Sequence, residues 1–240
     1  MLALSGCVAN HAPPFANAPY EPFSRAAAVA IATDEWRLWG SRVGEVPGYT
    51  QTQSSMGERQ QGLWQRVGEY WWEGMNAGEP DAAYTGMHDA RGHVFSIPAN
   101  GDYAWSAAFI SYVMRIAGAG PDFPYAPDHA TYINYAARAA AQKIAHPLLI
   151  AENPATYAPR RGDLACYARG DARLTFAGLP ASYIFPAHCG IITGGGPGDA
   201  DIIGGNVDDA VVLEHLRTDA QGRLDAKNWL VILRVLYRVN

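Results

Sequence analysis

The apolar residues of this 240-residue chain change their spacing once, and that change decides the fold class. Between positions 24 and 144 they recur at intervals of three and four, as along one face of a helix; Val29, Ala32 and Trp36 form such a stripe. From position 159 onward, short apolar runs stand between Gly and Pro clusters, which is typical of strands. Helices followed by strands indicate an α+β fold rather than alternating α/β units.

Four helices and five strands are predicted from this pattern. The helices span about residues 25–39, 58–74, 105–118 and 129–144, with Ser24 and Asp128 as caps of the first and the last. The strands span residues 163–167, 188–193, 201–205, 211–216 and 229–237. Their short connections favour an antiparallel meander, so we expect the helices to pack on an antiparallel sheet of five or six strands. Residues 77–102 are predicted to form a long loop.

Composition and charge exclude two classes of protein. The formal net charge is −5, and Lys and Arg form no block anywhere in the chain. Binding to nucleic acid through phosphate neutralisation is therefore not expected. No apolar run approaches the roughly 18 residues of a membrane-spanning helix, so none is predicted.

The first residues resemble a bacterial lipoprotein signal. Residues 4–7 read L-S-G-C, with small residues before Cys7, which would receive the lipid. Only three residues precede this motif, so we interpret it as a truncated signal. Residues 8–22 are rich in Pro, Ala and Asn and predict a tether. The predicted plan is a truncated lipoprotein signal and tether over residues 1–22 and one domain over residues 23–240. The protein would then be anchored in the cell envelope through Cys7, at the periplasmic face of the outer membrane because Val8 rather than Asp follows the cysteine.

Export would change the meaning of the two other cysteines. Cys166 and Cys189 lie on two predicted strands, and thiols can pair in an oxidising periplasm. A disulfide and two free thiols both remain open at this point.

Three short motifs carry residues that could perform chemistry. Ser106 lies in W-S-A-A-F-I-S at the start of the third predicted helix, His188 opens a strand in H-C-G-I-I, and Asn206 ends I-G-G-N. Each has a plainer interpretation: a helix cap, a hydrogen-bonded structural histidine and a turn residue. Taken together, a nucleophile at a helix N-terminus, a base and a residue that orients the base make up a hydrolase site.

The same motifs resemble the papain-like cell-wall peptidases of the NLPC and CHAP groups. Their helix motif resembles W-C-A-A-F-V-S, and P-x-x-G-D-L, H-x-G-I and G-N follow in the order found here over roughly residues 100–216. The likeness implies a papain-like fold, with Ser106 as nucleophile, His188 as base and Asn206 orienting it. Over nearly the whole mature chain, the sequence is similar to domain-of-unknown-function family 2272, whose pieces include R-V-G-E-Y-W at 66–71 and H-x-x-Y-I at 129–133.

Ser106 replaces the cysteine of those peptidases, and this leaves different functions open. A serine hydroxyl does not ionise beside a histidine as a thiol does, so it needs a well-oriented base and an oxyanion hole. One hypothesis is an envelope hydrolase of amide or ester bonds, with peptidoglycan stem peptides among its candidate substrates. The alternative is an inactive papain-like module that binds cell-wall fragments or a partner protein. A third is a structural lipoprotein of an envelope assembly.

Further residues could contribute to such a site. His129 and Tyr132 share one face of the fourth helix and are predicted, with Tyr103 and Trp105, to line a substrate groove. His129 making only a local hydrogen bond is the alternative. Asp208 and Asp209 could stand in for an acid that CHAP-type sites carry where this chain has Gly204, or could be solvated turn residues. No cofactor is predicted, and the spacing of His88 and His93 fits no compact zinc site.

Overall fold

The computed structural model describes residues 23–45, 56–75, 80–142, 147–170 and 172–237. Its helices are α1 Arg25–Leu38, α2 Leu63–Gly74, α3 Ser106–Ile116 and α4 His129–Gln142. Shorter 3-10 segments are η2 Gly57–Arg59, η3 Pro80–Ala83, η4 Ile97–Tyr103, η5 Gly120–Asp122 and η6 Phe176–Gly178. The four predicted helices are confirmed, although the second begins later than predicted because a 3-10 turn and Gly62, with a φ of 89°, precede it. The predicted long loop contains η3 and η4.

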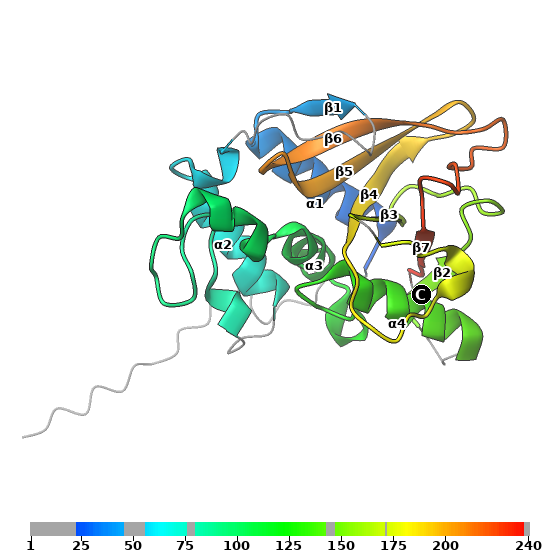
Figure 1. Cartoon of the computed structure of the whole chain (residues 1–240). Coiled ribbons are helices and arrows are strands. Elements are labelled where there is room, and N and C mark those ends of the chain that lie inside the picture. The colour runs from blue at the N-terminus through cyan, green and yellow to red at the C-terminus, as the bar shows by residue number, and fades with distance from the viewer. Residues whose placement is uncertain (1–22, 46–55, 76–79, 143–146, 171, 238–240) are drawn as a thin grey trace, which may run out of the picture.

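One curled sheet of seven strands forms the other half of the fold (Figure 1). The strands are β1 Val43–Glu45, β2 Leu149–Glu152, β3 Leu164–Ala168, β4 Ala187–Gly195, β5 Asp199–Val207, β6 Ala210–Arg217 and β7 Val231–Val235. Their order is β1-β6-β5-β4-β3-β7-β2. Every neighbouring pair is antiparallel except β1 and β6, which run parallel.

The α+β class is therefore confirmed, but the prediction of a purely antiparallel sheet of five or six strands is wrong. The meander β3-β4-β5-β6 is present as predicted, but the fifth predicted strand, β7, pairs with β3 and β2 and not with β6. The two missed strands contain three and four residues, which is too short for an alternating pattern to be recognised. β1 is also the parallel strand, reaching the edge of the sheet after α1 instead of through a hairpin.

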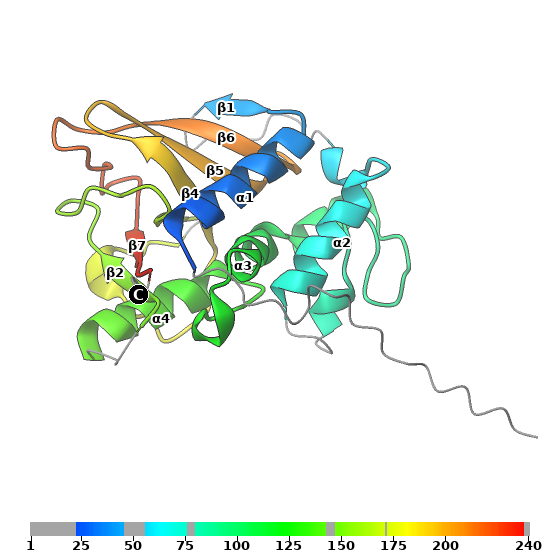
Figure 2. The ribbon, with the colours of Figure 1, turned by 180° about the vertical axis from the view of Figure 1, so that it is seen from behind.

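The helices cover one face of the sheet and leave the other to loops (Figure 2). α1 packs on β4, β5 and β6, α3 packs on β4 and β5, and α2 packs on α3. The main apolar core lies between these layers. A smaller cluster on the other face includes Ile202 and is covered by Leu224 and Trp229 from the segment before β7.

The ends of the helices follow the predicted caps. The Ser24 hydroxyl accepts a hydrogen bond from the amide of Ala27 at 3.0 Å, and Gly40, with a φ of 87°, ends α1. The Asp128 carboxylate accepts one from the amide of Thr131 at 2.8 Å in the first turn of α4. These caps fix where α1 and α4 begin along the chain.

A disulfide joins the two central strands β3 and β4. Cys166 and Cys189 are paired across the strands and bonded, with an S–S distance of 2.07 Å. The bridge that the sequence left open is thus present in the structure. Both cysteines face the main core, on the opposite side of β4 from His188.

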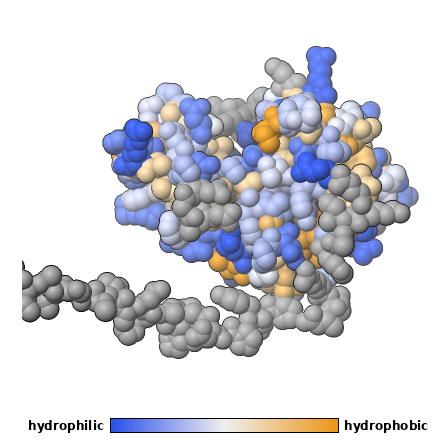
Figure 3. Space-filling model, turned by 90° about the horizontal axis from the view of Figure 1, so that it is seen from below, coloured by the Kyte–Doolittle hydropathy of each residue, from blue (hydrophilic) through white to orange (hydrophobic). Residues whose placement is uncertain are grey.

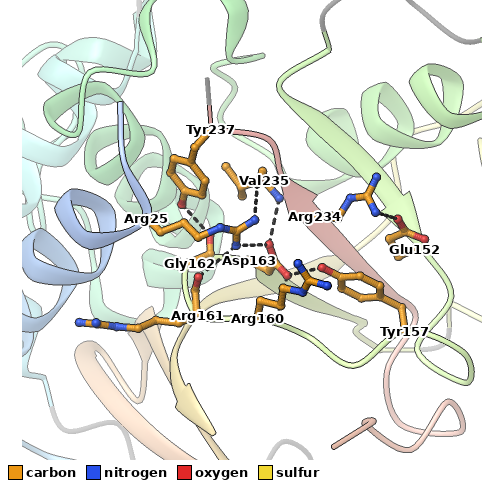
Figure 4. Close-up of polar contacts among 10 residues, drawn as sticks. All are labelled: Arg25, Glu152, Tyr157, Arg160, Arg161, Gly162, Asp163, Arg234, Val235 and Tyr237. Atoms are coloured by element: carbon orange, nitrogen blue, oxygen red, sulfur yellow. Dashed lines mark hydrogen bonds and ion pairs between the residues drawn. The ribbon is translucent and has the colours of Figure 1, made fainter. Parts of the chain in front are cut away.

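Asp163 is the buried acid of the P-x-x-G-D-L motif, and its role is structural (Figure 4). One of its oxygens accepts from Arg25 at 2.9 Å and from the amide of Val235 at 3.1 Å. The other accepts from Tyr157 at 2.9 Å and from the amide of Arg160 at 2.8 Å. The motif therefore ties the start of α1 to β3 and β7, which explains why an acid stands at this position.

The surface seen from below is mostly hydrophilic, with apolar side chains scattered in small groups (Figure 3). None of the helices in the described part of the chain combines the length and the apolar character needed to cross a membrane.

Candidate functional site

Ser106 is the first residue of α3 and lies beneath the surface, with 4% of it exposed. Its neighbour Trp105 precedes the helix in a non-helical conformation. The first amides of a helix have no acceptor within it, so the Ser106 side chain stands beside free N–H groups. The packing of α3 on β4 and β5 keeps its N-terminal end near the sheet.

The hydrogen-bond partner of Ser106 is His129. The Ser106 Oγ lies 2.8 Å from the His129 Nε2, and both groups are buried. His129 is the first residue of α4, so the contact joins the beginnings of two helices that are 23 residues apart. His129 was predicted to line a substrate groove; in the structure it is buried and is the hydrogen-bond partner of Ser106.

His188 completes a buried cluster with these two residues. It lies near the start of β4, and its ring centre is 5.4 Å from that of His129 and 5.4 Å from that of Tyr167. Only 3% of it is exposed. The expected contact between Ser106 and His188 is thus replaced by a chain of neighbours in which His129 stands between them.

Both imidazoles are uncharged at neutral pH. Burial, with a smaller contribution from the positive charge of Arg169, lowers the pKa of His188 to about 3. Burial, together with His188 and Arg169, lowers the pKa of His129 well below its ordinary value. The His129 Nδ1 and the His188 Nε2 are buried without a hydrogen-bond partner in the described residues. Such orphaned polar atoms are uncommon and often mark functional sites.

The two glycines of the I-G-G-N motif make room for this cluster. A Cβ at Gly204 would lie 2.8 Å from the His188 Nε2, and one at Gly205 would lie 2.6 Å from the Phe109 Cβ on α3. Both distances are shorter than non-bonded contacts allow, so β5 needs residues without side chains here. The motif allows close approach of α3 and His188 to β5.

Asn206 follows these glycines at a bulge of β5, with a φ of 56°. Within the described part of the chain, it makes no hydrogen bond to either imidazole. The two acids that were considered as substitutes also point elsewhere: Asp208 lies 3.8 Å from Arg42, and Asp209 accepts from the amide of Met56 at 3.4 Å. The described residues therefore supply no carboxylate or amide that orients His129 or His188.

The aromatic residues expected to line a groove are mostly part of the core. Trp105 is buried, stacks on Trp39 and donates its indole N–H to Glu58. The Tyr132 hydroxyl lies 2.6 Å from the carbonyl of Ala107 and is buried. Neither side chain lines an open surface in this conformation.

Tyr103 is the exception among these aromatics, because it is half-buried and stacks on Phe95 with ring centres 4.2 Å apart.

Sequence reasoning missed a buried acid near the site. Glu58 accepts from Trp105, and burial raises its pKa to about 7. Glu58 and Trp105 are 47 positions apart, so no local pattern in the sequence could indicate that they meet.

A second buried network accounts for the R-V-G-E-Y-W motif. Arg66 and Tyr70 of that motif both bond to the carboxylate of Glu35 on α1, Tyr70 at 2.6 Å. Tyr112 on α3 donates to the same acid at 3.2 Å. The motif therefore fastens α2 to α1 and α3, a structural role.

The two histidines whose spacing was considered for a metal site each contact a nearby residue. His93 lies 3.4 Å from Asp89, and His88 contacts Thr85 at 3.1 Å through its Nδ1. Within the described ranges, no group of three or more His, Cys, Asp or Glu side chains is arranged to hold a metal ion. Among the described residues, the Ser106–His129 pair is the arrangement with the clearest chemistry: a hydroxyl beside a neutral imidazole, in a buried site.

Comparison with known proteins identifies the family. The model of a family described as uncharacterised proteins conserved in bacteria, domain-of-unknown-function family 2272, matches residues 58–235. Because this match covers well over half of the chain, the protein belongs to that family. No curated protein and no solved structure shows a significant match. Cys7, the predicted lipidation site, lies outside the described residues.

Proposed function

We propose that this member of family 2272 is a papain-like serine hydrolase of amide or ester bonds, with Ser106 as nucleophile and His129 as general base. The observation that carries the proposal is the 2.8 Å contact between the Ser106 Oγ and the His129 Nε2. The papain-like layout is supported by α3, which carries Ser106 and packs on β4 and β5, the strands that carry His188 and Asn206.

The reaction follows from these positions. The His129 Nε2 takes the proton of Ser106 as the Oγ attacks the carbonyl carbon, and then gives it to the leaving amine or alcohol. Water hydrolyses the acyl-enzyme with the same imidazole as base. The first amides of α3 bind the oxyanion, with the helix dipole adding to their effect. The base is assigned to His129 instead of the expected His188 because only His129 contacts the hydroxyl.

The proposed site should be a weak catalyst, because no described acid supports the base. In serine proteases, loss of the aspartate function behind the histidine lowers kcat by about 10⁴-fold. No described carboxylate bonds to His129, and burial lowers its pKa, so its basicity is low. A slow turnover is expected, and covalent labelling is a more sensitive assay than product formation.

Access to Ser106 requires local opening, because the site is buried. The connection between β3 and β4 is attached to α4 by the Asn134 side chain, which accepts from the amide of Ala181 at 2.7 Å. The amide of Arg169 donates to the carbonyl of Pro186 at 2.9 Å and closes the base of this connection. Loops with few such attachments open most easily.

A fluorophosphonate probe tests the proposal, since it phosphonylates an activated serine with loss of fluoride. Labelling of Ser106, identified by peptide mass spectrometry, is expected in the wild type and absent in Ser106→Ala. Exposed Ser182 supplies the matched control, so Ser182→Ala is expected to label like wild type. His129→Asn is expected to slow labelling by about 10² to 10⁴-fold, the range for loss of a general base. Unlabelled Ser106 in intact protein, under conditions that label a known serine hydrolase, would refute the assignment.

Substrate class is tested in the same preparation with peptidoglycan fragments and with simple aryl esters and amides. Cleavage of peptidoglycan stem peptides would assign the substrate that the motif likeness implies. Cleavage of esters alone would limit the activity to small acyl compounds.

An inactive module is the second candidate, and the burial of Ser106 and His188 favours it. In this case the fold would bind a cell-wall fragment or a partner protein without turnover. Peptidoglycan fragments should then bind equally well to wild type and Ser106→Ala, with no cleavage by either. Cleavage that disappears in Ser106→Ala would reject it.

The envelope location remains a proposal, with lipid attached to Cys7. The Cys166–Cys189 disulfide supports it, because such bonds form and persist in oxidising compartments. Mass spectrometry of Cys7 peptides from the membrane fraction of the producing bacterium tests it. Unmodified Cys7, with the protein in the soluble fraction, would contradict the anchor.

A further inference from the structure

A small cavity opens beside β1, away from Ser106. It is lined by Arg42, Val43 and Gly44 around β1, by Val207 and Asp208 at the β5–β6 turn, and by Val212 and Glu214 on β6. Its volume is about 330 Å³, at the lower end of the range for small-molecule sites. Three valines supply most of its apolar wall.

Glu214 is the unusual residue of this cavity. It is 6% exposed, and it makes no hydrogen bond or ion pair with any described residue. Burial alone raises its pKa to about 7. An ionised carboxylate without a partner in such a place is unfavourable, and an apolar residue would continue the pattern of Val212 and Leu216 on the same face of β6.

The other charges around Glu214 do not neutralise it. Arg42 and Asp208 lie 3.8 Å apart and balance each other at the rim of the cavity. Tyr167, on β3, is the titratable group that senses Glu214: the negative charge of Glu214 contributes to the raised pKa of the Tyr167 phenol. His215 points to the other face of β6, where it pairs with Asp201 at 2.7 Å. The described lining residues therefore leave one uncompensated negative charge.

Gly44 lines the cavity wall directly beside Val212 and Glu214. A Cβ at Gly44 would lie 3.1 Å from the Val212 Cγ1 and 3.5 Å from the Glu214 Cγ. Any larger residue would press on these two side chains, which line the cavity. The sequence thus combines an unpaired acid, an apolar wall and a glycine that adds no side chain beside the acid.

We infer that this cavity binds a small organic ammonium ion, with its nitrogen paired to the Glu214 carboxylate and its alkyl part against Val43, Val207 and Val212. A desolvated carboxylate favours a cation strongly, because a charge-assisted hydrogen bond replaces the missing partner. The valines favour an alkylammonium over a metal ion, which needs several oxygen ligands.

The site is separate from Ser106 but close to the histidine cluster. A Cβ at Gly204 would lie 3.2 Å from the Val207 Cγ2 and 2.8 Å from the His188 Nε2, so the cavity wall and His188 meet at Gly204. The inference does not depend on hydrolase activity, and either can fail without the other.

Titration calorimetry with n-butylammonium tests the inference, and 1-butanol and butyrate serve as neutral and anionic controls. Butylammonium is expected to bind, and both controls to bind at least tenfold more weakly. Ionisation of Glu214 predicts an affinity about 30-fold higher at about pH 8 than at about pH 5.5, because the ionised fraction falls by that factor.

Two variants locate the binding. Glu214→Gln keeps the shape of the side chain and is expected to remove both the preference for butylammonium and the pH dependence. Glu69→Gln, at an exposed position of α2, is expected to bind like wild type. Gly44→Ala, which keeps the carboxylate but crowds Val212 and Glu214 in the cavity wall, is expected to weaken binding at least tenfold. Absent binding by the wild type, equal binding of butanol, or unchanged binding by Glu214→Gln would each overturn the inference.

Discussion

Replacing Glu214 by Gln should stabilise the protein, and only above acidic pH. The pKa of this carboxyl is about 7 in the folded chain against an ordinary value of 4.5. Below pH 4.5 the group is protonated in both the folded and unfolded states and contributes nothing to the pH dependence. Above pH 7 it is ionised in both, and the folded state carries the full unfavourable contribution. At 1.36 kcal/mol for each pKa unit, this amounts to about 3 kcal/mol.

The free energy of unfolding of Glu214→Gln relative to wild type should therefore rise by about 3 kcal/mol between about pH 4.5 and pH 8. Urea denaturation across this range, with the disulfide kept oxidised, measures the difference. Buried Glu58 also has a raised pKa, but it is present in both proteins, so its contribution cancels if the two sites act independently. Glu69→Gln should give a flat difference. A flat difference for Glu214→Gln as well would show that its carboxylate is solvated or paired, and the reasoning about the cavity would fail.

Three other substitutions test the structure around the site. Asp163→Ala should lower the free energy of unfolding by about 3–5 kcal/mol, because Arg25 loses its buried partner. As a control, Asp199→Ala at an exposed position should change this free energy by less than about 0.5 kcal/mol. Urea denaturation measures both, and similar effects of the two substitutions would contradict the hydrogen-bond network of Asp163. Gly204→Ala should lower the free energy of unfolding by about 1–3 kcal/mol and slow fluorophosphonate labelling of Ser106, because the new Cβ would collide with His188. Gly101→Ala, where the space is open, should leave both the free energy of unfolding and the labelling rate unchanged. Asn134→Ala should speed labelling of Ser106 by roughly fivefold, because one hydrogen bond of about 1 kcal/mol no longer holds the β3–β4 connection. An unchanged labelling rate would show that this connection does not control the access of the probe to Ser106.

Local chemistry in the sequence was sufficient for the four helices and for five of the seven strands, but not for their assembly. Ser24 and Asp128 are caps whose side chains act within three residues, so both helix starts were predicted correctly. β1 and β2 were missed because their pairing partners lie far along the chain, and three or four residues contain no recognisable period. Parallel pairing of β1 with β6 is a property of the whole sheet, so no short window could indicate it.

The candidate site shows the same division. Ser106 at a helix start, His188 near a strand start and the two glycines before Asn206 were singled out from short motifs, and the structure places the histidine and the glycines together. The choice between His129 and His188 as the neighbour of Ser106 depends on how α3 and α4 meet, which motifs do not encode. Trp105 was expected in a groove and lies in the core, because an aromatic beside a candidate nucleophile fits either place. Glu214 was not singled out because a strand with alternating exposure accommodates an acid without a sign of burial.

The serine at position 106 fits the electrostatics of its surroundings better than a cysteine would. A cysteine nucleophile works as a thiolate beside an imidazolium, two charges in the resting state. Burial keeps His129 and His188 neutral, and the same burial disfavours a thiolate. A hydroxyl with a neutral imidazole contains no charge until the substrate reacts. We therefore expect Ser106→Cys to carry a thiol whose pKa is at or above the ordinary value of about 8.5, measured from the pH dependence of iodoacetamide alkylation at this position. Alkylation that is already maximal near pH 6 would show an ion pair with His129, and would mean that the site supports charge separation despite its burial.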